Sequence, residues 1–213
     1  MRILLADHFP LQVGAVRSPL AELAQRLIDA GHEVQALIVG RGEQQEAGFP
    51  VHQVACRAGD IDADLPFEPP AWESDTSCSG FRSLSDQQLS DYRQALRHWI
   101  DLLVERFNPD IIHVEHVWLG AQLALETGVP YVIMARDEEL AEYEADVRCR
   151  QLAAQAAENA GRIFVADDEL RGRVLATFEH VDPQAVVVVL KGHGAPAAMV
   201  DHYGRVLAER FGR

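Results

Sequence analysis

The chain has 213 residues, 48% of them hydrophobic, so it is long enough to bury a substantial core within one domain. Acidic residues outnumber lysine and arginine by 33 to 19, and the resulting formal charge of -14 argues against nucleic acid as a partner. The three cysteines, Cys56, Cys78 and Cys149, are widely spaced and match neither a disulfide framework nor a zinc site, which favours a reducing cytoplasm.

Short apolar runs of the kind that are buried on both faces of a parallel sheet recur along the chain. In chain order they lie at 2–6, 34–39, 111–114, 131–135, 162–166 and 186–190, and a less apolar run at 51–55 is predicted nearer a sheet edge. Amphipathic helices are predicted at 17–30 and 85–107 from the spacing of their apolar residues. This alternation predicts a doubly wound, Rossmann-like α/β domain with a mostly parallel sheet of about seven strands.

Two further segments complete the pattern. Residues 57–81 are rich in proline and acidic residues and are predicted to form a long loop, which fits either a substrate lid or an ordered excursion. The last segment carries an apolar stripe that predicts an amphipathic helix over 198–211. No apolar segment approaches the roughly 20 residues that a membrane-spanning helix needs, so we expect a soluble protein, with contact to a membrane surface left open.

Ligands of an open α/β sheet bind outside the carboxyl ends of its strands. This rule selects the segments 7–18, 115–120, 136–140 and 167–170. Gly14 in the first segment would let backbone amides approach a ligand. His116 lies at a strand end, where ligand contact and a structural role are equally open, whereas Trp118 is interpreted as packing at a helix cap. The acids at 167–169 are interpreted as capping charges of the following helix.

Arg136 is the sharpest candidate, because a planar guanidinium at a strand end suits phosphate or carboxylate. The acids that follow it at 137–139 can neutralise it, and we favour this structural ion pair. His113 is interpreted as a core histidine with a hydrogen-bond partner, and His8 as a weaker candidate for the same cleft. The sequence contains no G-x-G-x-x-G, Walker A or H-E-x-x-H motif, so we predict neither a cofactor nor a metal ion.

Three segments in a fixed order carry a family resemblance. They are "MRILLADHFPLQVGAVRSPLAELAQRLIDAGHEVQALI", "FNPDIIHVEHVWLGAQLALETGVPYVI" and "AGRIFVADDELRGRVL" with "VDPQAVVVVLKG". Together they resemble the N-terminal domain of retaining GT-B glycosyltransferases of family four, and "PDIIHVEHVWLGA" is the most specific part. The resemblance implies that this domain holds the acceptor, a sugar or glycolipid. It also implies a second Rossmann-like domain that holds the nucleotide sugar.

Some positions depart from the family's pattern. The glycine pair of the first loop is Gly14 and Ala15, and the His-Gly and acid after the fifth strand are Arg136, Asp137 and Glu139. With the resemblance as guide, the predicted substrate-binding residues are Gly14, Ala15, His116, Trp118, Arg136 and Glu139. We assign no catalytic residue from the sequence.

The terminal helix resembles the last helix of GT-B enzymes, which crosses back onto the N-terminal domain. We therefore predict a Rossmann-like domain at 1–192 and a linker with a packing helix at 193–213, with the donor domain absent. On this hypothesis the chain is the acceptor-binding half of a glycosyltransferase, inactive alone, and its partner is a donor-domain chain. The alternatives are a non-catalytic binding or partner protein derived from that half and an unrelated flavodoxin-like or Rossmann-like binder.

Overall fold

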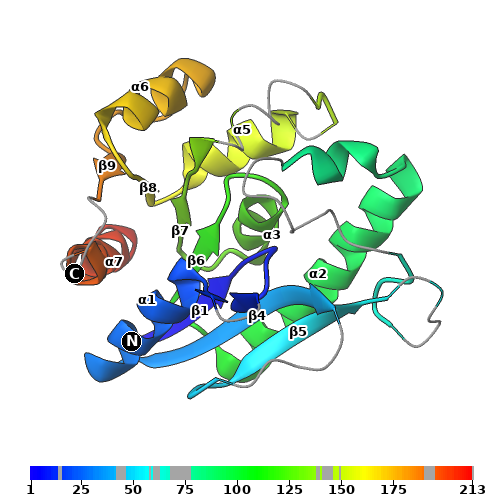
Figure 1. The fold of residues 1–213 in the computed structure, drawn as a ribbon. Helices are drawn as coiled ribbons and strands as arrows, with labels where there is room; N and C mark the ends of the chain where they lie inside the picture. Colours follow the sequence, from blue (N-terminus) through cyan, green and yellow to red (C-terminus); the bar gives the residue numbers. More distant parts are fainter. Residues whose placement is uncertain are drawn as a thin grey trace.

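The fold is an α/β sandwich built on a parallel sheet, seen in a computed structural model (Figure 1). The structure describes residues 1–13, 16–41, 47–57, 59, 63–67, 78–137, 140, 146–148, 150–189 and 195–212. Within these residues, seven parallel strands form one sheet in the order β5-β4-β1-β6-β7-β8-β9. The strands are β1 (Arg2–Ala6), β4 (Glu33–Arg41), β5 (Val51–Cys56), β6 (Ile111–Glu115), β7 (Tyr131–Met134), β8 (Arg162–Val165) and β9 (Val186–Val188). The predicted Rossmann-like sheet is confirmed.

Both faces of this sheet are buried, which is why its strands are mostly apolar. Along β4, Ala36 and Ile38 belong to the hydrophobic cluster on one face, whereas Leu37 and Val39 belong to the cluster on the other. The less apolar strand β5 lies at the edge of the sheet, as its composition predicts. The chain runs outward from β1 through β4 to β5 and then returns to β6 on the other side of β1. The topological switch point therefore lies between β1 and β6.

Helices cover the two faces unequally. Helices α1 (Pro19–Asp29) and α7 (Ala195–Phe211) lie on one face, and α2 (Asp86–Phe107), α3 (Leu119–Thr127) and α5 (Arg150–Asn159) lie on the other (Figure 1). Helix α6 (Asp168–Thr177) packs beside β8 and β9. The start of α1 is fixed by Ser18, which accepts a hydrogen bond from the backbone of Ala21, and the start of α2 by a capping box of Ser85 and Gln88.

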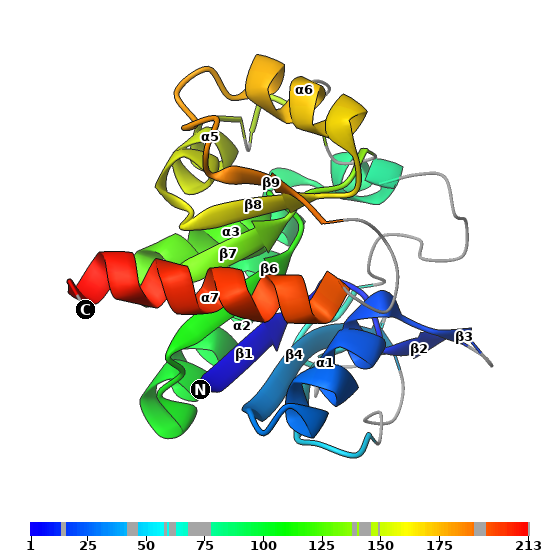
Figure 2. The ribbon, with the colours of Figure 1, turned by 90° about the vertical axis from the view of Figure 1, so that its left-hand side faces the viewer.

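Helix α7 runs across the α1 face of the sheet (Figure 2). Its Met199, Tyr203 and Val206 are buried in the same cluster as the core residues of α1. The helix can approach closely because Gly161 precedes β8, where a Cβ atom would lie only 2.5 Å from Val206 Cγ1. The division into 1–192 and 193–213 stays a prediction, but the apolar stripe of α7 is packed on the domain.

The loops differ from expectation in two places. Segment 7–18 contains a short antiparallel pair, β2 (Gln12–Val13) with β3 (Val16–Arg17), that its sequence did not indicate. Within 57–81, a β-bridge joins Cys56 to Leu65, and a 3-10 helix η1 spans Cys78–Ser83. Leu65 and Phe81 are buried, so the described parts of this segment pack on the domain, and residues 68–77 lie outside the described residues. Among the helices that the structure describes, none has both the length and the apolarity to cross a membrane.

Candidate functional site

Polar side chains gather where β1 and β6 end, on either side of the switch point. Asp7 and His8 follow β1 directly, and β6 ends in Glu115 with His116 next to it. All four residues are buried. They lie at the edge of the sheet where open α/β proteins bind their ligands. Buried polar groups at a switch point have to be held by partners, and those partners define what the site can do.

His116 is the most unusual residue of this group. Its backbone has a φ of +89°, in the region that residues other than glycine rarely adopt, and its N–H donates to the carbonyl of Met134 at 3.0 Å. Its Nε2 lies 3.3 Å from Asp7 Oδ1. A strained backbone that holds an imidazole against a carboxylate at the switch point is typical of a functional position. The structure therefore brings His116 together with Asp7, the first residue of the segment 7–18 that the strand-end rule selects.

His8 faces away from solvent, toward the helix layer. Its Nδ1 is 3.0 Å from the Tyr92 hydroxyl of α2. Burial, assisted by the neighbouring His116, lowers the pKa of His8 to about 3, so the ring is neutral at pH 7. Its Nε2 has no hydrogen-bond partner among the described residues. Gly120 allows the first turn of α3 to pack closely against Val114 of β6, because a Cβ atom at position 120 would lie 2.8 Å from Val114 Cγ1.

Aromatic side chains cover the site from the α3 side. Trp118 is the N-cap residue of α3 and makes no capping hydrogen bond with its side chain. Its ring packs edge-on against Phe81 of η1, with ring centroids 4.4 Å apart, and Phe81 also contacts His8 at 5.4 Å. Trp118 is thus buried packing at a helix cap, as its position in the sequence suggests.

Arg136 lies beside this group, after β7. It is paired with Glu115, the last residue of the neighbouring strand β6, through a contact of its Nη2 and a hydrogen bond of 3.2 Å from its Nε to Oε2. The side chain of Glu115 is 3% exposed and that of Arg136 is 34% exposed. Arg136 therefore closes a buried carboxylate against solvent.

Glu115 also connects the site to α7. His113 Nε2 lies 3.5 Å from Glu115 Oε1, and His113 Nδ1 is hydrogen-bonded to the Tyr203 hydroxyl of α7. Burial by itself would raise the pKa of Glu115, but the adjoining His113 and the charge of Arg136 outweigh it and lower the pKa to about 2. Glu115 is therefore a fixed negative charge at pH 7. His113 is fully buried and has a partner, as its place in an apolar strand suggests.

Acidic side chains that follow β7 and β8 have defined partners. Arg136 forms a structural ion pair, as favoured, and Glu115 is a partner in it. Register brings the two together: β6 and β7 are neighbours, and Glu115 pairs with Met134, two residues before Arg136. Asp137 pairs with Arg173 of α6, and the acids at 138 and 139 lie outside the described residues. Asp167 caps α6 by accepting from the backbone of Leu170 at 2.8 Å, as predicted.

The remaining predicted site residues, Gly14, Ala15 and Glu139, lie outside the described residues. Within the described part of the chain, no three histidine, cysteine or acidic side chains form a group that could hold a metal ion. The chemistry that the described site offers is hydrogen bonding by Asp7 and His116, next to the fixed charges of Glu115 and Arg136.

A family model covers most of the chain. The model of the glycosyl transferase 4-like domain matches residues 14–192. This chain belongs to that family. As a glycosyltransferase 4-like domain it has the GT-B type of Rossmann-like fold, as the resemblance implied. No curated protein sequence matches the chain significantly.

Solved glycosyltransferase structures share the fold of this glycosyltransferase 4-like domain. Sucrose-phosphate synthase from Thermosynechococcus elongatus aligns with a TM-score of 0.58 and 11% identity, over 90% of this chain and 48% of the synthase. The apo form of the lipopolysaccharide outer core galactosyltransferase WaaB aligns with a TM-score of 0.51 and 13% identity, over 91% of this chain and 46% of the enzyme. The domain thus spans about half the length of these enzymes.

A further structure of the same synthase matches along almost its whole length. It aligns with a TM-score of 0.58 and 12% identity, over 99% of each chain. At such identities the likeness concerns the fold alone.

Proposed function

We propose that this chain is the acceptor-binding half of a glycosyltransferase, and that sugar transfer requires a donor domain in addition. The observation that carries the proposal is the Asp7–His116 pair at the switch point, with Nε2 and Oδ1 3.3 Å apart on a strained backbone. A carboxylate and an imidazole can accept and donate hydrogen bonds, which is the chemistry that orients the hydroxyl groups of a sugar.

The role of the site is positioning rather than proton transfer by a charged base. Proximity and orientation contribute strongly to catalysis when an acceptor hydroxyl is held against a reactive centre. Arg136 cannot remove a proton, since a guanidinium does not lose its own in a protein. It supplies fixed charge at the edge of the site, where His113 and Arg136 together keep Glu115 ionised.

The need for a donor domain is supported by the lengths of the similar enzymes. The chain spans 48% of the synthase and 46% of the galactosyltransferase. The shorter synthase structure aligns over 99% of each chain, so the alignment includes α7.

Turnover assays test this proposal. The chain alone, incubated with uridine and guanosine diphosphate sugars and with carbohydrate acceptors, is expected to show neither hydrolysis nor transfer. Fusion of the donor domain of a similar enzyme between residue 192 and α7 is expected to restore transfer, and His116→Asn is expected to reduce it, because asparagine tolerates a positive φ but lacks the imidazole. Turnover by the chain alone, or tight binding of a nucleoside diphosphate to it, would overturn the proposal.

A further inference from the structure

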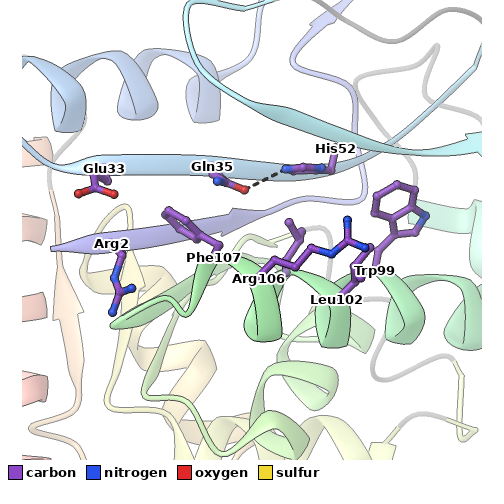
Figure 3. Close-up of a pocket in the computed structure, with 9 residues that line it drawn as sticks. Arg2, Glu33, Gln35, His52, Trp99, Leu102, Arg106 and Phe107 are labelled. Atoms are coloured by element: carbon purple, nitrogen blue, oxygen red, sulfur yellow. Dashed lines mark hydrogen bonds between the residues drawn. The ribbon is translucent and has the colours of Figure 1, made fainter.

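A cavity of about 490 Å³ opens at the amino end of the sheet, on the edge opposite the candidate site (Figure 3). It lies between the C-terminal half of α2 and the first residues of β1, β4 and β5. Its volume is in the range of small-molecule sites, which is roughly 300 to 1,000 Å³. The proposed acceptor site plays no part in it, so the two sites can be tested separately.

The cavity exists because polar residues interrupt the face of the sheet that α2 covers. On this face of β4, Leu37 and Val39 are apolar core residues, but Gln35, two residues earlier, is polar. His52 of β5 lies beside it, and the His52 Nε2 and Gln35 Oε1 atoms are 2.9 Å apart. If an apolar helix face packed against this polar pair, the pair would lose its contact with water or a ligand, which costs free energy. Helix α2 therefore lies further from the sheet here.

The opposite wall is one face of α2, formed by Trp99, Leu102, Arg106 and Phe107. In Figure 3 the Arg106 guanidinium lies next to the Trp99 ring. Arg106 forms no ion pair within the described part of the chain. By contrast, Arg93 and Arg97 of the same helix both pair with Glu126. Arg106 is exposed at the cavity, so its guanidinium is available to an anion there, although the chain as a whole carries a net charge of -14.

The other ionisable groups that line the cavity are paired, lie away from Trp99 or are uncharged at pH 7. Arg2 Nη2 lies 3.8 Å from Asp110 Oδ1, and the same carboxylate accepts a hydrogen bond of 2.7 Å from the Arg2 backbone. Glu33 is the carboxylate among the lining residues, and it lies at the Arg2 end, away from Trp99 (Figure 3). Burial lowers the pKa of His52, so its imidazole offers hydrogen bonds rather than charge at pH 7.

We propose that this cavity binds a small phosphate monoester that carries a ring. The phosphate is held by the fork of donors of Arg106, and the ring packs on Trp99. Gln35 and His52 supply hydrogen bonds to polar groups of the ring. The chemistry is shared by a sugar phosphate and an aryl phosphate, which the experiment below distinguishes.

Tryptophan side-chain N–H resonances provide a direct readout, because the chain has only 3 tryptophans. Trp99→Phe assigns the resonance of Trp99. Titrations use glucose 6-phosphate and phenyl phosphate, with inorganic phosphate and glucose as the separate parts of the ligand. We expect at least one ester to shift the Trp99 resonance to saturation and to bind at least about tenfold more tightly than inorganic phosphate or glucose. The ester that binds identifies the ring as a sugar or an aromatic group.

Arg106→Gln and Arg93→Gln form a matched pair, because each removes one positive charge from α2 and only the first lies in the cavity. We expect Arg106→Gln to weaken binding of the ester by about tenfold or more and Arg93→Gln to leave it unchanged. The proposal fails if neither ester gives a saturable shift of Trp99, if inorganic phosphate binds as tightly as the esters, or if both arginine variants weaken binding equally.

Discussion

Removal of the Arg136 side chain tests the ion pair that closes the candidate site. In Arg136→Ala, the Glu115 carboxylate, which is 3% exposed, loses its only partner of opposite fixed charge in the described structure and keeps His113. Breaking a fully buried pair costs about 3 to 5 kcal/mol, because it leaves a buried charge. Arg136 itself is 34% exposed, so water screens part of its interaction. We therefore expect the variant to lose about 2 kcal/mol of unfolding free energy at pH 7.

Urea unfolding of the variant beside Arg173→Ala measures this effect. Arg173 also forms an ion pair near the site, but with Asp137, and both partners are exposed. Its removal is expected to change the unfolding free energy by less than about 0.5 kcal/mol. The reasoning would be refuted if the two variants were equally stable. If Arg136→Ala kept full stability but lost binding of an anionic ligand, Arg136 would be a ligand-binding residue instead.

The stability difference between the wild type and Arg136→Ala should also depend on pH in a predictable direction. The pKa of Glu115 is lowered in the folded state, from 4.5 to about 2. Its contribution to stability is therefore complete above about pH 4.5 and is lost as the pH falls toward 2. Since Arg136→Ala weakens this lowering, the stability gap between wild type and variant should narrow below about pH 4.5. A gap that widens with acid would contradict the assignment.

Three further predictions concern the core. The pKa of His8 is about 3 in the folded state and 6.5 as its ordinary value. The wild type should therefore lose up to about 1.4 kcal/mol of unfolding free energy for each pH unit below pH 6.5. His8→Gln should lack this part of the loss when the free energy of unfolding is measured against pH. Tyr203→Phe should cost about 1 to 2 kcal/mol in urea unfolding, because His113 Nδ1 loses its buried partner; an unchanged stability would show that water replaces the hydroxyl. Deletion of residues 195–213 should lower the melting temperature or cause association, as sedimentation would show, because the α1 face loses its cover; a stable monomer would contradict the docking of α7.

The central strands could be predicted closely because they are buried on both faces and so appear as apolar runs. β1 was predicted at its observed limits, and β5 was placed at the edge from its weaker apolar character. The pair β2 with β3 could not be predicted, because strands of two residues carry no periodicity.

The site could be predicted in position but not in its contacts. The strand-end rule located His116 and Arg136, because both follow apolar runs directly. The ion pair of Arg136 could be predicted, but not that Glu115 takes part in it, because only strand register brings Glu115 near. Asp7 had a weak signal in its position directly after β1. The link from His113 to Tyr203 had none, because 90 residues separate the two.

The most direct test of the acceptor-binding proposal is to map carbohydrate binding on the chain itself. A two-dimensional amide NMR spectrum would be followed during titration with a panel of mono- and disaccharides, in the wild type and in His116→Asn. The account predicts saturable shifts at residues 7–9 and 115–118 for at least one sugar, lost in His116→Asn, and no shifts there with uridine or guanosine diphosphate. Nucleotide binding at these residues, or sugar binding that leaves them unshifted, would contradict it.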